Sequence, residues 1–270
     1  MTDVYTTITE VDQAVLESLA LILELRAADP QQVAMRVAYQ GQLRLSPSAT
    51  VAEVGCGTGA VARSLAGLYR SCRVIGLDWS DRFIEHARRL AGELPNLEFC
   101  VGEATCLPFA NASVDAIVFH TTLCHIPELA LALAEARRVL RPGGALAVFD
   151  ADYSSTNVAT GEIDPLQSCV AACVQAIVHH PFLVHQLAPA VRRAGFEIRS
   201  FQSLGYNGVS DAQYLLTIID RGADALAADG RITRQLAEAL KTEARHRERT
   251  GTFFGHLAYA ALIATRPSEE

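Results

Sequence analysis

Hydrophobic and polar positions alternate between two patterns from residue 50 to residue 151. Short apolar runs typical of buried strands are separated by amphipathic stretches with the spacing of helices. The predicted strands are 50–54, 73–78, 97–102, 114–120 and 145–151, and the predicted helices are 60–69, 80–94 and 128–140. Strands that alternate with helices indicate a parallel sheet covered by helices on both faces.

The chain is mainly helical on either side of this alternating region. Helices are predicted at 10–28 and from Pro30 to about Leu43, where Asp29 is a suitable N-cap before a proline in the first helical turn. After Asp152 the predicted helices are 165–180, 181–195 and 210–249, and two further strands are predicted at 196–205 and 253–266.

Composition narrows the class of protein. The 270 residues include 23 Lys and Arg against 30 Asp and Glu, a net charge of −7, which disfavours nucleic acid and anionic membranes as partners. The N-terminus lacks the pattern of a secretory signal, and the longest uncharged segment, 165–191, is interrupted by polar residues and a proline, so we expect no membrane span. Seven cysteines without a C-x-x-C pair favour reduced thiols and a cytoplasmic location.

Three glycines at alternate positions, Gly55, Gly57 and Gly59, follow the first of these strands in "VAEVGCGTGA" (51–60). Such a turn lets a ligand approach the backbone at a helix N-terminus, as in nucleotide sites. Asp78 ends the next strand, where an acid can accept both hydroxyls of a ribose, and a nicotinamide enzyme would place its acid there too. Glu53 decides between these ligands, because an acid beside the turn would repel a pyrophosphate and suits an ammonium group.

Four segments in order resemble the class I S-adenosylmethionine-dependent methyltransferases, in the ubiquinone/menaquinone-biosynthesis-like branch with a methyltransferase type 11 domain. They are "AEVGCGTG" (52–59), "GLDWSDRFIEHAR" (76–88), "VGEATCLPFANASVDAIVFHTTLCHIPE" (101–128) and "ARRVLRPGGALAVFD" (136–150). The resemblance implies an α/β fold with a Rossmann-like, seven-stranded, mostly parallel sheet, helices on both faces, N-terminal helices and a helical lid. It divides the chain into an N-terminal helical segment, 1–45, and a methyltransferase domain, 46–270, with lid insertions at about 153–180 and 206–252.

The resemblance also implies S-adenosylmethionine as the cofactor and assigns its binding residues. Glu53 and the turn formed by Gly55, Cys56, Gly57 and Gly59 would hold the methionine part. Asp78 would bind the ribose, Trp79 would pack on the adenine, and Glu103 would receive the adenine amino group beside Ala104. Phe119 and His120 would line the sulfonium side.

His125 and Asp150 are the candidates for proton transfer, which a methyl acceptor needs only if it carries a proton that must leave. His125 is a base candidate or, equally, a histidine that bonds a backbone group. Asp150 could orient His125, act as the base, or cap a loop. Tyr153 and Phe254 are the expected acceptor-binding residues. No metal is expected, because His179, His180 and His185 have no carboxylate partner nearby in the sequence.

The function predicted from these residues is methyl transfer to a small, mainly apolar organic acceptor, on oxygen, nitrogen or carbon. A protein of the same fold and cofactor without methylating activity, such as a cyclase, is the alternative. The spacing of the glycines and Glu53 argue against a nicotinamide oxidoreductase. A nucleic-acid methyltransferase is disfavoured because "FHTTLCH" replaces the Asn/Asp-Pro-Pro-aromatic signature at 119–125. We expect a small-molecule partner, no nucleic acid, and a monomer or homodimer.

Overall fold

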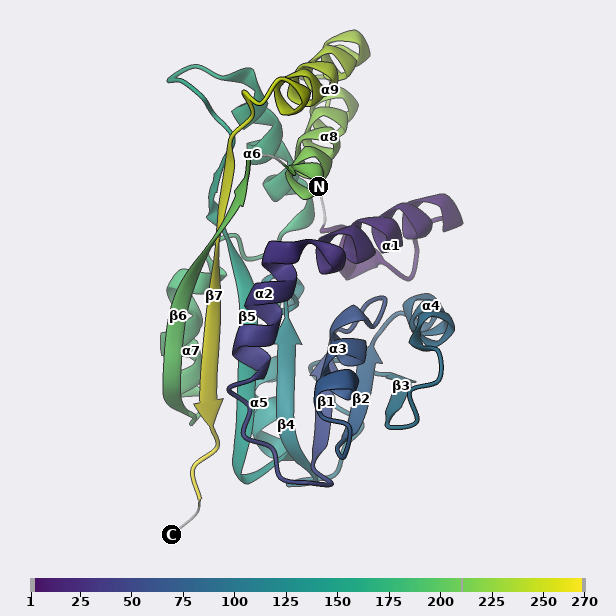
Figure 1. The fold of residues 1–270 in the computed structure, drawn as a ribbon, viewed down its shortest axis with the longest axis vertical. Coiled ribbons are helices and arrows are strands. Elements are labelled where there is room, and N and C mark those ends of the chain that lie inside the picture. The colour runs from purple at the N-terminus through teal and green to yellow at the C-terminus, as the bar shows by residue number, and fades with distance from the viewer. Residues whose placement is uncertain (1–2, 210, 269–270) are drawn as a thin grey trace.

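A twisted seven-stranded sheet runs through the computed structural model, which describes residues 3–209 and 211–268 (Figure 1). Its strand order is β3-β2-β1-β4-β5-β7-β6, and only β7 runs antiparallel to its neighbours β5 and β6. The strands are β1 Thr50–Val54, β2 Arg73–Asp78, β3 Leu97–Val101, β4 Val114–His120, β5 Leu140–Asn157, β6 Glu197–Gly208 and β7 Gly255–Thr265. The predicted Rossmann-like α/β sheet is confirmed.

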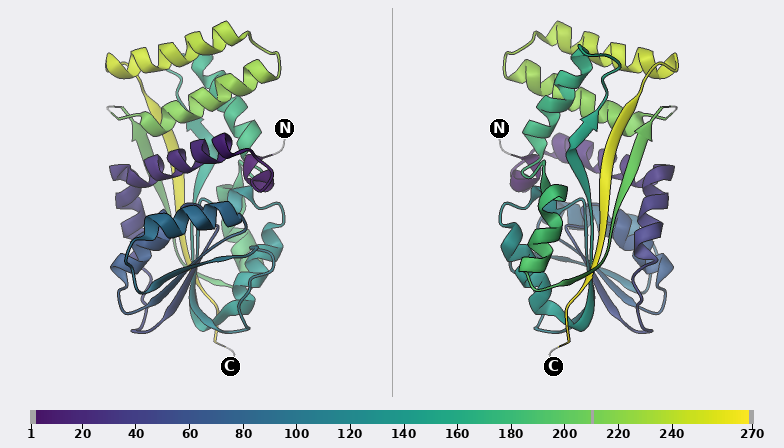
Figure 2. Two further views of the ribbon diagram at one scale, coloured as in Figure 1. Left: turned by 90° about the vertical axis from the view of Figure 1, so that its right-hand side faces the viewer. Right: turned by 90° about the vertical axis from the view of Figure 1, so that its left-hand side faces the viewer.

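Helices cover both faces of this sheet. Helices α2 (Pro30–Gln40), α3 (Ala60–Leu68) and α4 (Asp81–Ala91) lie on one face, and α5 (Leu129–Val139) and α7 (Leu183–Arg193) lie on the other (Figures 1 and 2). The predicted N-cap Asp29 is confirmed, because its carboxylate accepts from the amides of Gln31 and Gln32. Helix α4 is capped by the Ser80 hydroxyl, which accepts from Phe83 N.

Five of the described elements lie beyond the carboxyl ends of the central strands. Helix α1 (Gln13–Ala28) crosses above β1 and β2, preceded by the short 3₁₀ helix η1 (Val4–Thr7). Helices α6 (Pro165–Ile177), α8 (Gln213–Ala228) and α9 (Arg234–Arg249) stack together where β5, β6 and β7 extend past the sheet (Figures 1 and 2). Helices α6, α8 and α9 lie in the ranges predicted for the lid insertions, about 153–180 and 206–252.

Several boundaries differ from the sequence prediction. Strand β5 was expected at 145–151 but runs from Leu140, which pairs with Val114, to Asn157, which pairs with His256 of β7. Residues 210–249 were expected as one helical stretch but form α8 and α9, because Gly230 with φ of +69° ends the first and Thr233 caps the second. Residues 1, 2, 210, 269 and 270 of the expected segments lie outside the described residues.

The core lies between the sheet and its helices, with fully buried side chains from the central strands β1, β4 and β5. A second, smaller hydrophobic cluster joins the N-terminal segment to α4. It consists of Ile8, Leu16, Leu19, Ala20 and Phe83. In the part of the chain that the structure describes, no helix is long and apolar enough to cross a membrane. On α1 the packed face is narrow: Leu16, Leu19 and Ala20 are buried, whereas Val15 is 40% exposed.

Candidate functional site

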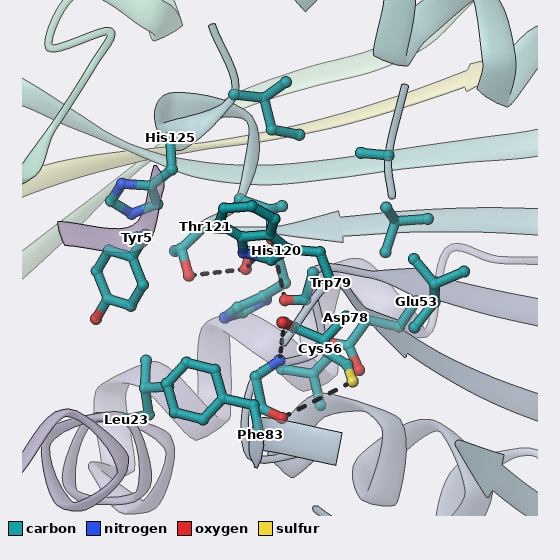
Figure 3. Close-up of a pocket in the computed structure, with 18 of the residues that line it drawn as sticks. Tyr5, Leu23, Glu53, Cys56, Asp78, Trp79, Phe83, His120, Thr121 and His125 are labelled. Atoms are coloured by element: carbon teal, nitrogen blue, oxygen red, sulfur yellow. Dashed lines mark hydrogen bonds between the residues drawn. The ribbon is translucent and has the colours of Figure 1, made fainter. Parts of the chain in front are cut away.

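A cavity of about 320 Å³ opens at the carboxyl ends of β1, β2 and β4 (Figure 3). This edge is where open α/β sheets bind their ligands, because the strand order reverses between β1 and β4. Helix α1 and the η1 segment form the opposite wall through Tyr5, Ile8, Leu23 and Arg26. The cavity therefore lies between the sheet edge and the N-terminal segment.

The glycine turn forms the floor of this cavity. Gly55, Gly57 and Gly59 all adopt positive φ, at +73°, +50° and +77°, a conformation that costs residues with a side chain. Gly55, Cys56 and Gly57 line the cavity, whereas Gly59 packs behind it, where an added Cβ would lie 2.7 Å from the Phe99 ring. An added Cβ on Gly57 would lie 3.0 Å from Leu23 Cδ1, so the turn and α1 are in close contact.

Glu53 is buried at the cavity wall with only 1% of its surface exposed. Its Oε2 atom has no hydrogen-bond partner among the described residues. Burial raises the pKa of Glu53 well above its usual range, while the Ala62 amide and the nearby Arg36 and Arg63 favour its ionised form. A buried, unpaired carboxylate oxygen is costly to keep unless a ligand donates to it.

Asp78 lies beside Glu53, at the end of β2 (Figure 3). Its carboxylate accepts from Gly57 N at 2.8 Å and from Ser80 N at 3.0 Å. Burial raises the pKa of Asp78 to about 6 in spite of these amide donors. Asp78 therefore fastens the glycine turn to β2, and its carboxylate also lines the cavity.

Trp79, Glu103 and Ala104 line the far side of the same cavity. Trp79 is 40% exposed, so a ring face is available to a flat ligand. Glu103 is exposed and accepts a hydrogen bond from the Thr105 hydroxyl at 2.7 Å.

Residues at the end of β4 divide between the cavity and the core. His120 lines the cavity, and its Nδ1 bonds Tyr39 Oη at 2.9 Å. Burial, with help from Arg26 and Arg36, holds the His120 pKa well below its usual value, so the ring is neutral. Phe119 points to the other side of the strand and is fully buried, so it does not line the cavity as expected.

Two arginines at the cavity wall were not identified from the sequence. Arg26 donates to Thr121 Oγ1 at 2.6 Å, and Thr121 itself adopts a positive φ of +52°, which is unusual for a β-branched residue. Arg36 donates to Ala27 O at 3.0 Å, and its buried Nε has no partner among the described residues. Both residues come from α1 and α2, upstream of the segments that carried the family resemblance.

His125 lies at the cavity wall and belongs to the 3₁₀ helix η2 (Leu123–His125). Its Nδ1 contacts Asp3 Oδ2 at 2.8 Å, and its ring lies 4.5 Å from the Tyr5 ring (Figure 3). The Asp3 carboxylate also accepts from Tyr5 N and His179 N. An acidic partner at Nδ1 favours the tautomer in which Nδ1 carries the proton and Nε2 has a free lone pair.

Asp150 does not hold the His125 ring in this arrangement. It is fully buried, lines neither cavity, and accepts from the amides of Cys124 at 3.3 Å and Ala151 at 2.9 Å. This is the loop-capping role that was one of the alternatives for Asp150, and Asp3 makes the ring contact instead.

A second, small cavity of about 20 Å³ lies beside the first, and the two share Tyr5, Leu23, Arg26 and His125 as a common wall. Tyr153 lines this small cavity. Phe254 is 44% exposed and lines neither cavity. Of the two expected acceptor residues, only Tyr153 is therefore next to the candidate site.

Histidines 179, 180 and 185 do not share a site. His180 Nε2 bonds the carbonyls of Ile126 and Pro127, whereas His185 lies near Asp152 and Ser154. Within residues 3–209 and 211–268, no group of three or more His, Cys, Asp or Glu side chains is arranged to hold a metal ion.

Comparison with known proteins places this architecture in a family. Residues 52–148 match the model of a family described as "Methyltransferase domain". The chain is 34% identical over 116 residues to a 2-phytyl-1,4-naphtoquinone methyltransferase of Thermosynechococcus vestitus, covering 43% of this chain and 52% of that protein. It is 28% identical to O-methyltransferase resE of Aspergillus sclerotiorum, covering 83% of this chain and 78% of that protein.

Among solved structures, the cyclase SpnF has the same fold, with a TM-score of 0.57 and 23% identity over 88% of this chain and 82% of that one. The sheet, the glycine turn and the family match together define a class I S-adenosylmethionine-dependent methyltransferase fold. The family match covers residues 52–148 of the chain, and together with the methyltransferase relatives it supports this class of protein. For three of the strongest matches, the aligned stretch covers 44%, 52% and 44% of the relative's own length, so the chain spans about half of those proteins.

Proposed function

We propose that this protein binds S-adenosylmethionine in the larger cavity and transfers its methyl group to oxygen on a small organic acceptor. The observation that supports this proposal best is the buried Glu53 Oε2, which lacks a partner beside the glycine turn. An ammonium group would supply the missing donor, and the turn leaves room for a ligand close to its backbone. The residues present therefore fit the cofactor.

The lining residues suggest how the cofactor would be held. Glu53 would accept from the methionine ammonium, and Arg36, with its unpaired Nε and its charge acting on Glu53, would donate to the methionine carboxylate. Asp78 would accept from the ribose hydroxyls. Trp79 would pack on the adenine, with Glu103 and Ala104 at its edge. When bound, the cofactor supplies a methyl group made electrophilic by the sulfonium charge.

His125 is the proposed base, with Asp3 as the residue that orients it. The Asp3 carboxylate fixes the proton on Nδ1, which leaves Nε2 able to accept a proton from an acceptor hydroxyl. Methylation of oxygen is supported by the relative named an O-methyltransferase, which aligns over most of this chain. Asp150 and Phe254 have no part in this proposal, because neither lines a cavity.

Titration with S-adenosylhomocysteine, followed by an assay of methyl release, tests this function. Glu53→Gln should weaken binding by roughly 10- to 150-fold, because a hydrogen bond to a charged group contributes about 1.5–3 kcal/mol. Glu85→Gln, on the exposed face of α4, is the matched control and should bind like the wild type. Tight NAD binding without S-adenosylhomocysteine binding would refute the cofactor. Cofactor binding without methyl release to any acceptor would favour a non-methylating enzyme of this fold.

A further inference from the structure

The wall of the small cavity carries two positively charged side chains. Two arginines, Arg26 at the end of α1 and Arg221 in the middle of α8, contribute to it. Both are half-buried, and neither forms an ion pair with any residue that the structure describes. Among the described residues that line this cavity there is no Asp or Glu.

Apart from His125 and Cys173, the remaining lining residues are apolar or phenolic. Tyr5, Tyr153 and Tyr214 surround the two guanidinium groups, and Ile177 and Ile218 close the cavity from α6 and α8. A guanidinium removed from water without a counter-ion is unfavourable, and a tyrosine hydroxyl is only a weak substitute for a carboxylate. The nearby carboxylate of Asp3 contacts His125 Nδ1 at 2.8 Å rather than either arginine.

We infer that this cavity binds the anionic group of the methyl acceptor, a carboxylate carried on an apolar or aromatic body. This inference rests on the proposed methyl transfer and names the class of acceptor. A guanidinium fork binds a carboxylate through two parallel hydrogen bonds, and tyrosine hydroxyls can donate a third. At about 20 Å³ the cavity is only a little larger than one water needs, so only the carboxylate would enter it and the body of the acceptor would lie in the larger cavity.

The residues that line both cavities connect the proposed head-group site with the site of methyl transfer. His125, Tyr5, Leu23 and Arg26 line both cavities, so a head group in the small one places the acceptor beside His125 and the larger cavity. Arg26 is also positioned to contact a ligand in the larger cavity. Arg221 lines only the small cavity, so it is the residue that distinguishes recognition of the acceptor from recognition of the cofactor.

Calorimetric titration of the full chain loaded with S-adenosylhomocysteine tests the inference. The probes are octanoate and cinnamate, each compared with its neutral amide, octanamide or cinnamamide. The wild type should bind the carboxylates at least tenfold more tightly than the amides. Arg221→Gln should bring that ratio close to one, and Arg221→Lys should keep part of it. The exposed Arg231→Gln is the control and should keep the wild-type ratio.

Equal affinity for carboxylates and amides in the wild type, no binding of either carboxylate, or an unchanged ratio in Arg221→Gln would overturn the inference. The affinity for S-adenosylhomocysteine distinguishes failure of this inference from failure of the proposed function. It should be the same in Arg221→Gln as in the wild type, whereas a wild type that does not bind S-adenosylhomocysteine would refute the proposed function itself.

Discussion

At the scale of single residues, two buried carboxylates determine which ligand groups the candidate cofactor site can bind. Glu53 has an oxygen without a partner, and Asp78 is held by the amides of Gly57 and Ser80. Burial raises the pKa of both groups. A ligand that donates hydrogen bonds to them stabilises the ionised forms, so binding and ionisation are coupled.

This coupling predicts a pH dependence of cofactor affinity. The pKa of Asp78 without ligand is raised to about 6, and donation from ribose hydroxyls would lower it in the complex. The dissociation constant for S-adenosylhomocysteine should therefore be constant well above pH 6. It should rise by up to roughly tenfold per pH unit as the pH falls through that value.

Asp78→Asn tests the contribution of Asp78 to this pH dependence, because the variant retains Glu53 and the titration of Glu53. Its affinity should be lower throughout, since an amide accepts more weakly than a carboxylate, and its dissociation constant should depend less on pH. Calorimetry from pH 5 to pH 8, with circular dichroism as the check on folding, is the measurement. Identical pH profiles for wild type and variant would show that the ribose is held elsewhere.

His125 and Asp3 predict a second effect at the residue scale. His125→Ala should lower turnover by roughly 10²–10⁴-fold if the acceptor hydroxyl must lose its proton. Affinity for S-adenosylhomocysteine should change little. Asp3→Asn should lower turnover by less than His125→Ala, because a neutral amide orients the ring and its tautomer less strongly than the carboxylate does.

Asp150→Asn is the matched control for Asp3→Asn, because Asp150 is a nearby carboxylate that caps backbone amides instead of contacting the ring. It should lower thermal stability and leave turnover unchanged. Lower turnover in Asp150→Asn together with unchanged turnover in Asp3→Asn would return the orienting role to Asp150.

The sequence identified the glycine turn, Glu53 and Asp78 because their chemistry lies in contiguous motifs. It did not identify Arg26 and Arg36, which line the same cavity, or Asp3, which contacts His125 at the cavity wall. A contact such as Asp3 with His125 joins residues 122 positions apart. The local spacing of residues cannot predict such a contact, because it forms only when two distant segments pack against the same edge of the sheet.

At the scale of elements, the wall of the small cavity depends on a close approach of α6 and α8. At Gly222 an added Cβ would lie 1.7 Å from the carbonyl oxygen of Cys169, so the two backbones touch. Gly222 follows Arg221 directly, and Cys173 lies one turn after Cys169 on the cavity wall. The contact between α6 and α8 therefore determines how deeply Arg221 is buried.

Gly222→Ala should separate α6 from α8 and destabilise the protein by about 1–3 kcal/mol, the usual cost of overpacking. At roughly 2–4 °C per kcal/mol for a chain of this size, the loss is readily measured as a lower Tm. Gly67→Ala is the control, because it is also in a helix but its Cβ would meet nothing within 4 Å. It should leave the Tm unchanged or raise it slightly, and equal effects of both variants would contradict the packing argument.

The sequence predicted which segments form helices and which form strands, but it did not predict how long each element is. The alternation of apolar runs and amphipathic stretches is a local signal, and it placed all seven strands that the structure describes. Strand β5 exceeds its predicted range because Asp152 pairs with Ala258 and Asn157 with His256. Those partners lie about a hundred residues away, and only the folded sheet determines how far the pairing extends.

At the scale of the whole molecule, the N-terminal segment closes the larger cavity. Ile8, Leu16 and Leu19 pack against Phe83 of α4, and Leu23 lies over the glycine turn. Arg82 adds hydrogen bonds to Val11 O and to Gln13. This cluster is separate from the main core, so it can open without unfolding the sheet. We propose that the segment acts as the entrance to the cofactor site.

Hydrogen exchange with mass spectrometry tests this role. S-adenosylhomocysteine in the larger cavity would lie against α1, which lines that cavity through Leu23 and Arg26. The amides of residues 13–28 should therefore exchange more slowly when it is bound, because opening then requires release of the ligand. Helix α9, residues 234–249, lines neither cavity and should exchange at the same rate with and without ligand. Leu19→Ala removes part of the N-terminal cluster at a residue that does not line the larger cavity. It should speed exchange in α1 and raise the ligand dissociation rate by a similar factor, since both processes require the same opening. Faster exchange in α1 with an unchanged dissociation rate would show that the ligand leaves by another route and that the N-terminal segment is only a packed cover.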